Sequence, residues 1–377
     1  MKVLFLTRDL PYPPTSGYKK RNFYLLEEMT ARKIDVVCKE MMSIKGKEQK
    51  MPKAVSAFLS LFSTLPFSVR IRTSLKIKRE IRRYLKENPV DVIICDSIFW
   101  SLNIPEFKGH KILYEHNIES VIVKRYVEME QNIFKKSFAC IEYLKLERFQ
   151  KKMWKKFDSC IVCSALDKET MQEKAGKINV FVINNGVDTK HFKRDSYPVS
   201  KNTLVYTGEI GWYPNEDAIM YFVKEIFPLI KKSEPEVKFW IVGNNPSLKI
   251  RKLTEKDKSI IVTGFVDDVR EFVGKACVYV APLRIGSGTR LKILEALSME
   301  KPVVSTSIGC EGLELETDKH LLIKDNPEEF ARAVLSLLKN EGLRVSLGQN
   351  GRKLTQERYD WKIVFKDLNS IVKVRLK

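Results

Sequence analysis

The segment 277–307, CVYVAPLRIGSGTRLKILEALSMEKPVVSTS, contains a complete strand–helix–strand pattern. The apolar run at each end is rich in β-branched residues and does not alternate with polar ones, which is typical of a strand buried on both faces. Between the runs, Leu291, Leu294 and Leu297 recur at helical spacing. A Gly–Ser–Gly turn at 286–288 joins the first strand to the helix. The segment therefore predicts parallel strands linked by a crossover helix.

The same alternation of apolar runs and helical segments continues along the whole chain. The first half contains six such runs, at 3–7, 35–38, 91–96, 111–115, 159–164 and 180–185, and the second half six more, at 203–208, 238–243, 260–264, 277–282, 302–307 and 320–324. Two sets of about six strands predict an α/β fold of two doubly wound parallel sheets with a cleft between them. We expect domains at 1–188 and 201–358, a linker at 189–200, and a C-terminal helix within 359–377 that packs back on the first domain.

Composition points to a soluble globular enzyme. The 377 residues are too many for one ordinary core, and 44% are apolar and 30% charged. The apolar run at 3–7 is shorter than the core of a signal peptide, and no stretch approaches the roughly 20 apolar residues of a membrane span. The seven cysteines are scattered, and the CxxC pair Cys160–Cys163 has no second pair nearby. These observations predict a cytoplasmic protein with reduced thiols.

The net charge of +20 is concentrated in the first half of the chain. Residues 1–200 hold 38 Lys and Arg against 23 Asp and Glu, and residues 201–377 hold 29 against 24. The basic stretch 70–86 has apolar residues at helical spacing and follows the apolar segment 54–67, which suits attachment to an anionic membrane surface. The alternative is the solvated face of an ordinary surface helix. Nucleic acid is disfavoured because no aromatic residues interleave the charges.

The loop 286–291, GSGTRL, suggests a phosphate site. It lacks the third glycine of the dinucleotide fingerprint, which disfavours a nicotinamide cofactor. Free N–H groups at the start of a helix favour a phosphate, whereas cations such as Arg290 and Lys292 are disfavoured there by up to about 1 kcal/mol. The negative charge of a bound diphosphate would compensate the unfavourable position of Arg290 and Lys292. The alternative is that both are ordinary surface cations at the start of the helix. Glu295 lies further along the helix, where it can hold a ribose diol or pair with Lys292.

These stretches resemble one known family. PLRIGSGTRLKILEALSMEKPVV (282–304) is similar to the donor-site motif of the retaining glycosyltransferases of family four, the "group 1" enzymes. LPYPPTSGYKKR (10–21) and YEHNIES (114–120) resemble segments of their first domain, as do FDSCIVCSALDKE (157–169) and VINNGVD (182–188). TGEIGWYPNEDAI (207–219), WIVGNNP (240–246), TGFVDDV (263–269) and VSTSIGCEGL (304–313) resemble segments of the second. The resemblance spans nearly the whole chain and implies two facing Rossmann-like domains, the B-type glycosyltransferase fold.

By that resemblance the second domain binds a UDP- or GDP-linked sugar. Glu295 matches the second glutamate of the family's E-x7-E motif and would hold the ribose, while Ser287 replaces the first glutamate. Glu209 and Asn215 stand in the region where many relatives have a phosphate-binding Arg and Lys, so Arg290 and Lys292 would neutralise the diphosphate. The further donor contacts implied are Gly208, Asn215, Gly243, Phe265, Val266, Gly286, Ser287, Gly288, Thr289 and Leu291.

The first domain would bind the acceptor, a glycan or lipid-linked sugar in cell-surface polysaccharide or glycolipid synthesis at the cytoplasmic membrane face. Gly17 would let its loop approach the diphosphate, His116 would contact the donor sugar or the acceptor, and Glu119 is the candidate base on the acceptor side. No DxD motif follows a strand, so we expect neither metal nor cofactor. The alternatives are a degenerate family member that only binds nucleotide or glycan, and an inverting transferase or epimerase on the same fold.

Overall fold

The computed structural model describes residues 1–45, 53–195, 197–366 and 368. The chain divides into an N-terminal unit, Met1–Asn184 with Phe365–Lys377, and a C-terminal unit, Asn185–Val364. These boundaries lie four residues before the predicted end of the first domain at 188 and six residues after the predicted end of the second at 358. Each unit contains one six-stranded sheet in which every strand pair is parallel.

The N-terminal unit has the strand order β2-β1-β3-β4-β5-β6. Its strands are β1 (Lys2–Thr7), β2 (Asp35–Glu40), β3 (Val92–Asp96), β4 (His110–Tyr114), β5 (Ser159–Val162) and β6 (Val180–Val182). Its helices are α1 (Gly17–Ala31), α2 (Met41–Lys45), α3 (Lys53–Leu61), α4 (Phe67–Arg70), α5 (Leu75–Glu87), the 3₁₀ segment Ile98–Asn103, α6 (Glu119–Met129), α7 (Ile133–Trp154) and α8 (Ala165–Ala175). Strands β3 and β5 are buried along their whole length and β1 is buried after Lys2, which is why their sequences are mainly apolar.

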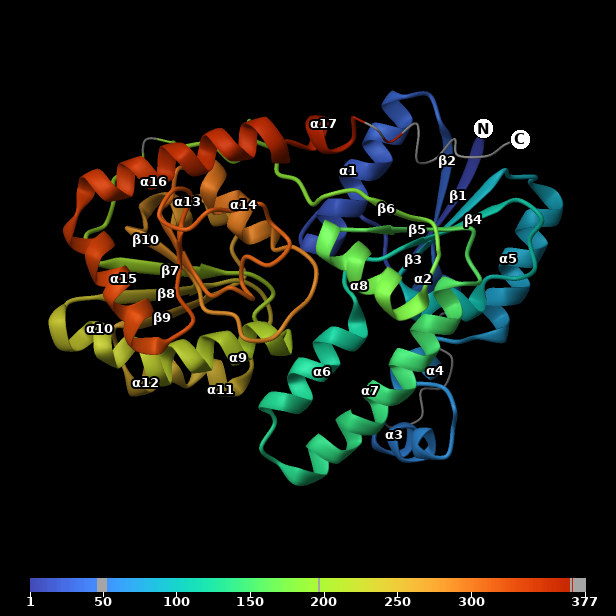
Figure 1. Ribbon diagram of the computed structural model, residues 1–377, viewed down its shortest axis with the longest axis horizontal. Helices are drawn as coiled ribbons and strands as arrows, with labels where there is room; N and C mark the ends of the chain where they lie inside the picture. The colour runs from blue at the N-terminus through green and yellow to red at the C-terminus, as the bar shows by residue number, and fades with distance from the viewer. Residues whose placement is uncertain (46–52, 196, 367, 369–377) are drawn as a thin grey trace. The chain divides into compact units, whose positions relative to one another are not determined.

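The C-terminal unit has the strand order β12-β11-β10-β7-β8-β9. Its strands are β7 (Thr203–Thr207), β8 (Lys238–Val242), β9 (Ile260–Gly264), β10 (Val278–Ala281), β11 (Val303–Ser305) and β12 (Leu322–Ile323). Its helices are α9 (Tyr213–Tyr221), α10 (Phe227–Ser233), α11 (Leu248–Arg251), α12 (Leu253–Lys256), α13 (Val269–Lys275), α14 (Leu291–Ser298), α15 (Pro327–Lys339), α16 (Glu341–Leu354) and α17 (Trp361–Val364), with π segments at Phe222–Ile226 and Thr355–Tyr359. Helix α10 packs with α15, and α14 packs with α16 on the other face of the sheet (Figure 1).

All twelve predicted strands are present, and the predicted fold class is confirmed. The segment 213–233 is helical throughout, with a π segment at Phe222–Ile226 between α9 and α10. Its inner face carries Ile219, Phe222, Ile226 and Ile230, which are fully buried, and Val223 packs partly against the same core. Only part of the predicted C-terminal helix over 359–377 lies within the described residues.

The end of the described chain is fastened to the N-terminal unit. Arg32 Nη2 donates to the carbonyl of Phe365 at 2.6 Å and Arg32 Nη1 to that of Lys366 at 3.2 Å. The side chain of Leu368 is buried. These contacts explain why the chain after Val364 belongs to the same unit as β1.

Candidate functional site

The carboxyl edge of each sheet contains a point where the strand order reverses. In the C-terminal unit it lies between the adjacent strands β7 and β10, and in the N-terminal unit between β1 and β3. Ligands of doubly wound folds bind outside the carboxyl ends of the strands at such a point. The residues that follow β7 and β10, and those that follow β1 and β3, are therefore the candidate site residues of the two units.

In the C-terminal unit two glycines make the strand ends approach closely. Gly208 follows β7 with a φ of +149° and Gly243 follows β8 with a φ of +144°. A Cβ atom on Gly243 would lie 1.8 Å from the carbonyl oxygen of Gly208, and one on Gly208 would lie 2.7 Å from Lys292 Nζ. Both positions therefore require glycine, for space and for backbone conformation.

Lys292 points its ammonium group beneath this pair of glycines. Its Nζ donates to Tyr206 Oη at 2.9 Å and to Asn215 Oδ1 at 3.0 Å, and lies 4.0 Å from the centre of the Tyr206 ring. Burial, and then the charge of Arg290, lower the pKa of Lys292 to about 7. The amide nitrogen of Asn215 donates to the Glu209 carbonyl at 2.7 Å, so Asn215 holds the lysine while its other end is bound to the backbone.

Arg290 is enclosed by the glycine loop. It is the N-cap residue of α14 and only 6% exposed, and its Nη1 donates to the carbonyl oxygens of Ser287 and, at 3.0 Å, Gly288. Gly286 has a φ of +159°, and a Cβ there would lie 1.9 Å from Arg290 Nη2. Arg290 therefore holds the loop in place and puts a buried positive charge below it. The helix begins with two cations, as the sequence predicted, and both are drawn inward.

The other predicted donor contacts lie along the same edge. Glu295 is half-buried on α14, two turns below the loop, and Leu291 is the first residue of that helix. Phe265 and Val266 follow β9, next to Gly243, whose N–H donates to the Gly264 carbonyl at 3.1 Å. Phe265 is 60% exposed, whereas Val266 packs partly against the core. Thr289 Oγ1 is buried and has no hydrogen-bond partner among the described residues.

Sequence reasoning missed two residues of this edge. Tyr206 is fully buried at the end of β7 and links Lys292 to Asn215 through its hydroxyl group, which donates to Asn215 Oδ1 at 2.6 Å. Arg284 pairs with Asp217 at 2.7 Å and lies 4.3 Å from the centre of the Tyr221 ring. The available signal for Tyr206 was a tyrosine hydroxyl group near the end of the apolar run TLVYTG, two residues before Gly208. Nothing in the sequence around Arg284 indicates its partner.

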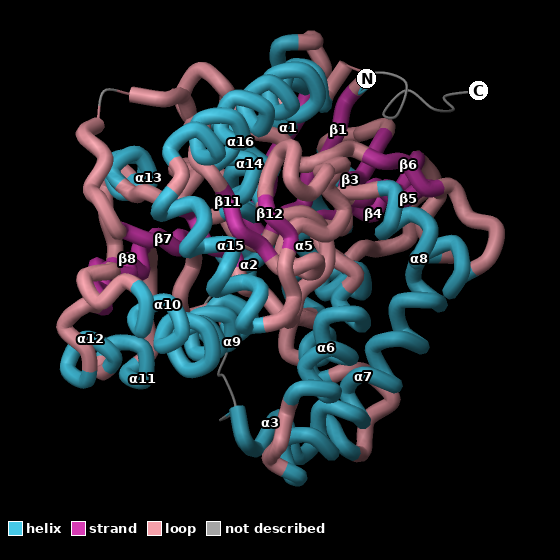
Figure 2. The backbone as a smooth tube through the Cα atoms, turned by 60° about the vertical axis from the view of Figure 1, so that its left-hand side comes forward, coloured by secondary structure: helices cyan, strands magenta, loops and turns pink. Residues whose placement is uncertain are grey.

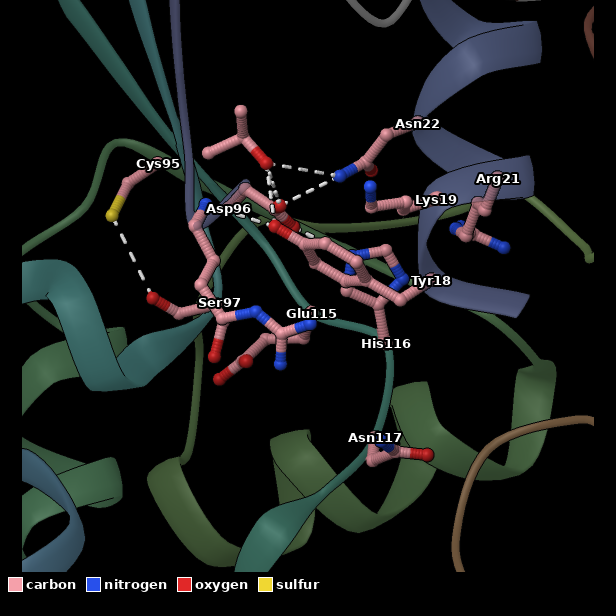
Figure 3. Close-up of polar contacts among 12 residues, drawn as sticks. Tyr18, Lys19, Arg21, Asn22, Cys95, Asp96, Ser97, Glu115, His116 and Asn117 are labelled. Carbon is pink, nitrogen blue, oxygen red and sulfur yellow. Dashed lines mark hydrogen bonds and ion pairs between the residues drawn. The ribbon is translucent and has the colours of Figure 1, made fainter. Parts of the chain in front are cut away.

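The N-terminal unit gathers a polar cluster at its own strand switch (Figure 3). Asp96, the last residue of β3, is fully buried, and three side chains besides Tyr18 form hydrogen bonds with its carboxylate. Two reach its Oδ2, from Thr7 Oγ1 at 2.9 Å and Asn22 Nδ2 at 2.7 Å; the third joins Oδ1 to His116 Nε2 at 2.6 Å. The Tyr18 ring packs edge-on against His116, and its hydroxyl group lies 2.5 Å from Thr7 Oγ1.

The cluster holds one ionised carboxylate. Burial alone would raise the pKa of Asp96, but His116 and the hydrogen bonds from His116, Tyr18 and Thr7 outweigh it and lower the pKa below its ordinary value. Burial and the neighbouring Asp96 raise the pKa of Tyr18, so its hydroxyl stays protonated. An ionised Asp96 cannot donate, so His116 Nε2 carries the hydrogen of their bond. The predicted site residue His116 is thus fixed in orientation by Asp96, which the sequence reasoning did not single out.

The two other candidates of this unit lie at helix starts. Gly17 is the first residue of α1, behind the N-cap Ser16, whose side chain accepts from the Lys19 N–H at 3.3 Å. Glu119 is the first residue of α6, and burial raises its pKa to about 7. A carboxyl group with a pKa near neutral suits proton transfer.

The remaining candidates carry no site of their own. Cys160 and Cys163 are buried thiols that form no disulfide. Within the described ranges no group of three or more His, Cys, Asp or Glu side chains is placed to hold a metal ion. None of the described helices is both long and apolar enough to cross a bilayer.

Sequence comparison identifies a family model and several known proteins to which this chain is similar. Residues 201–340 match the family model for glycosyl transferases group 1. The chain is 24% identical, over 97% of its length and 98% of the relative's, to an uncharacterized 44.6 kDa protein in the cps region of Klebsiella pneumoniae. It is 23% identical to the capsular polysaccharide biosynthesis glycosyltransferase CapM of Staphylococcus aureus, over 54% of this chain and 57% of that one.

Solved structures share the fold. Sucrose-phosphate synthase from Thermosynechococcus elongatus superposes with a TM-score of 0.77 at 14% identity, over 99% of this chain and 98% of that one. Anabaena Alr3699/HepE in complex with UDP-glucose gives 0.67 at 12% identity, over all of both chains. The fold is therefore that of the B-type glycosyltransferases, with two Rossmann-like domains.

Proposed function

We propose that this chain belongs to the glycosyl transferases group 1 family, whose model matches residues 201–340, and that it moves a sugar from a UDP- or GDP-linked donor to a glycan or lipid-linked acceptor. The reaction would serve cell-surface polysaccharide or glycolipid synthesis on the cytoplasmic side of the membrane. The name of the Staphylococcus relative, a capsular polysaccharide glycosyltransferase, and the UDP-glucose complex of the Anabaena neighbour support this choice.

The observation that carries the proposal is Lys292 beneath the glycine edge. A lysine whose pKa is lowered to about 7 by burial and by Arg290 is energetically unfavourable in its charged form unless an anion is bound. Gly208 and Gly243 leave bare backbone above it, since any side chain there would collide with its surroundings. A diphosphate can come close to that backbone, and its charge would restore the charged form of Lys292.

The neighbouring residues would complete the donor site. The loop Gly286–Thr289, held by Arg290, would offer its N–H groups to the diphosphate or the sugar, and Arg290 would add positive charge from below. Glu295 would accept hydrogen bonds from the ribose hydroxyl groups. As the sugar–phosphate bond breaks, negative charge grows on the leaving diphosphate, so Lys292 and Arg290 would stabilise the transition state.

The N-terminal unit would present the acceptor. His116, oriented by Asp96, would contact the sugar or the acceptor hydroxyl, and Glu119 is the candidate base. Retention of the anomeric configuration would follow from attack on the same face, with the leaving phosphate oxygen taking the acceptor proton. We expect turnover in the presence of EDTA.

The test is a panel of UDP-, GDP- and dTDP-sugars scored for donor hydrolysis and transfer. Glu295→Ala should abolish turnover, whereas Glu225→Ala, a change at an exposed glutamate of the same unit, should leave it intact. NMR of the product would show the configuration; an inverted product would point to the inverting alternative, and a donor isomer to an epimerase.

The second candidate is a binding protein without turnover. It is favoured by Ser287, which is buried where relatives have a glutamate. If wild type and Glu295→Ala were equally inert while both bound nucleotide, the enzyme proposal would be wrong and this one correct.

A further inference from the structure

Two helices of the N-terminal unit expose large apolar side chains. On α3 and the residue after it, they recur at helical spacing, and Phe58 and Phe62 are 60% and 79% exposed. On the first turn of α7, Ile133 and Phe134 are 71% and 84% exposed. We call this set the α3–α7 apolar surface; it consists of Val55, Phe58, Leu59, Leu61, Phe62, Ile133, Phe134, Ile141 and Leu144.

Specific hydrogen bonds fasten the two helices together. Lys145 Nζ, on α7, donates to the carbonyls of Ser60 at 2.6 Å and Leu61 at 3.2 Å, at the end of α3. The carboxylate of Glu142, also on α7, accepts from the N–H groups of Phe67 at 2.8 Å and Ser68 at 3.1 Å, at the start of α4. Both views of the fold show α3 beside α7, at the end of the N-terminal unit that points away from its sheet (Figure 1, Figure 2).

The segments that carry the α3–α7 apolar surface are strongly basic. Residues 53–86 hold nine Lys and Arg against one acidic residue, and residues 121–156 hold ten against four. Lys135 and Lys136 are exposed directly after Phe134. The basic helix α5 itself cannot insert its apolar face into lipid, because Ile77 and Ile81 are buried in the protein core. The membrane contact that the sequence predicts for 70–86 is therefore better placed on α3 and α7, which expose apolar side chains. Helix α5 can add positive charge to it.

We propose that the α3–α7 apolar surface inserts into the headgroup region of an anionic lipid bilayer. Exposed aromatic and aliphatic side chains rimmed by lysines are the combination that binds such a surface, because insertion buries the apolar groups while the cations meet lipid phosphates. Pairing with a second copy is disfavoured, since it would bring two strongly basic surfaces together. Docking concerns this surface alone and holds whether or not the chain transfers sugar.

Vesicle co-sedimentation of the full chain, without nucleotide sugar, tests this. The probes are vesicles of phosphatidylcholine with and without phosphatidylglycerol. We expect binding to the anionic vesicles only, and a fall of about tenfold in partition coefficient for Phe58→Ser/Phe62→Ser and for Ile133→Ser/Phe134→Ser. Leu248→Ser, at a 76% exposed leucine of the C-terminal unit, is the matched control and should bind as wild type.

Three results would overturn the proposal. Wild-type binding by both double variants would mean that charge alone attracts the chain. Equal binding to neutral vesicles would remove the anionic specificity. A dimer in light scattering that the double variants dissociate, with no vesicle binding, would assign the surface to a second copy. Unchanged thermal unfolding of the variants, expected because the side chains are exposed, shows that loss of binding is not loss of fold.

Discussion

The carboxyl edges of the two sheets are built from different groups. The N-terminal unit fills its strand switch with side chains that satisfy one another: Asp96 accepts from Thr7, Asn22 and His116. The C-terminal unit leaves its edge as bare glycine backbone above Lys292, with Arg290 buried beside it. In the first arrangement, which we call the balanced edge, the side chains bond to one another without a ligand; in the second, which we call the unbalanced edge, two cations lie close together beneath the glycine backbone.

This difference indicates what each edge contributes to folding stability and to donor binding. A cluster in which several side chains hydrogen-bond to one buried carboxylate stabilises the fold and fixes one histidine, so its disruption should lower stability. Arg290 and Lys292 lie close enough that the charge of Arg290 lowers the pKa of Lys292, so an added anion should favour the charged form of the lysine. Variants of the two edges should therefore separate into those that change folding and those that change donor binding.

The largest effect is expected for Gly243→Ala. The new Cβ would lie 1.8 Å from the Gly208 carbonyl oxygen, at a φ of +144°, so the strand ends must move apart. We expect a loss of roughly 4 kcal/mol in the free energy of unfolding and about a hundredfold weaker UDP binding. Chemical denaturation and calorimetric titration would measure both.

Gly176→Ala is the control for that change. Gly176 also has a positive φ, +77°, but no atom lies within 4 Å of its Cβ position. Backbone strain alone should cost about 1 kcal/mol and leave UDP binding unchanged. Equal losses for the two variants would show that close packing of the strand ends does not matter.

Asp96→Ala should break the balanced edge. It removes a buried carboxylate and leaves the donors of Thr7, Asn22 and His116 without their acceptor, which we expect to cost about 3 kcal/mol of stability. Asp217→Ala, which removes the partner of the half-exposed Arg284, should cost less than about 1 kcal/mol. UDP affinity should survive Asp96→Ala; a specific loss of affinity with unchanged stability would contradict the assignment of this cluster.

Much of the fold was predictable because buried parallel strands have continuous apolar sequences. Each predicted run contains an observed strand, down to the two residues of β12. The strand order was not predictable, since an apolar run does not indicate which other strand it pairs with. The π segment at Phe222–Ile226 was also hidden, because its inner face keeps an apolar pattern close to that of an α-helix.

The candidate site was predictable where a residue type is required by local backbone chemistry. Gly208 and Gly243 stand directly after strands and Gly286 lies in the loop after β10, and the structure requires glycine at each. Contacts between distant segments could not be read from the chain: Lys292 meets Tyr206 and Asn215, 86 and 77 residues away. Asp96 was missed for the same reason, because His116 lies 20 residues beyond it.

Lys292→Met tests the unbalanced edge, and its expected effect is smaller than those of the variants above. Methionine has a similar length and no charge, so stability should be unchanged or slightly higher, while affinity for a nucleotide sugar should fall by about thirtyfold. The matched control is Lys301→Met. Lys301 is a second buried lysine of the same unit, and its ammonium donates to the carbonyls of Gly274 and Ala276. That variant should lose stability and keep its affinity; the reverse pattern would refute the role of Lys292.

The smallest effect is the dependence of donor binding on pH. Because the pKa of Lys292 in the free protein is lowered to about 7, the lysine is charged at about pH 6 and mostly neutral at about pH 8.5. A diphosphate binds the charged form, so affinity should fall as the pH rises above 7, by at most about tenfold per pH unit, with a proton taken up on binding. A nucleotide sugar is the proper ligand, since its diphosphate has no proton that titrates in this range.

Calorimetry in buffers of different ionisation enthalpy would measure the number of protons taken up on binding. Lys292→Met should abolish the slope and Lys301→Met should keep it; if the slope persists without Lys292, another group titrates and the charge assigned to this edge lies elsewhere.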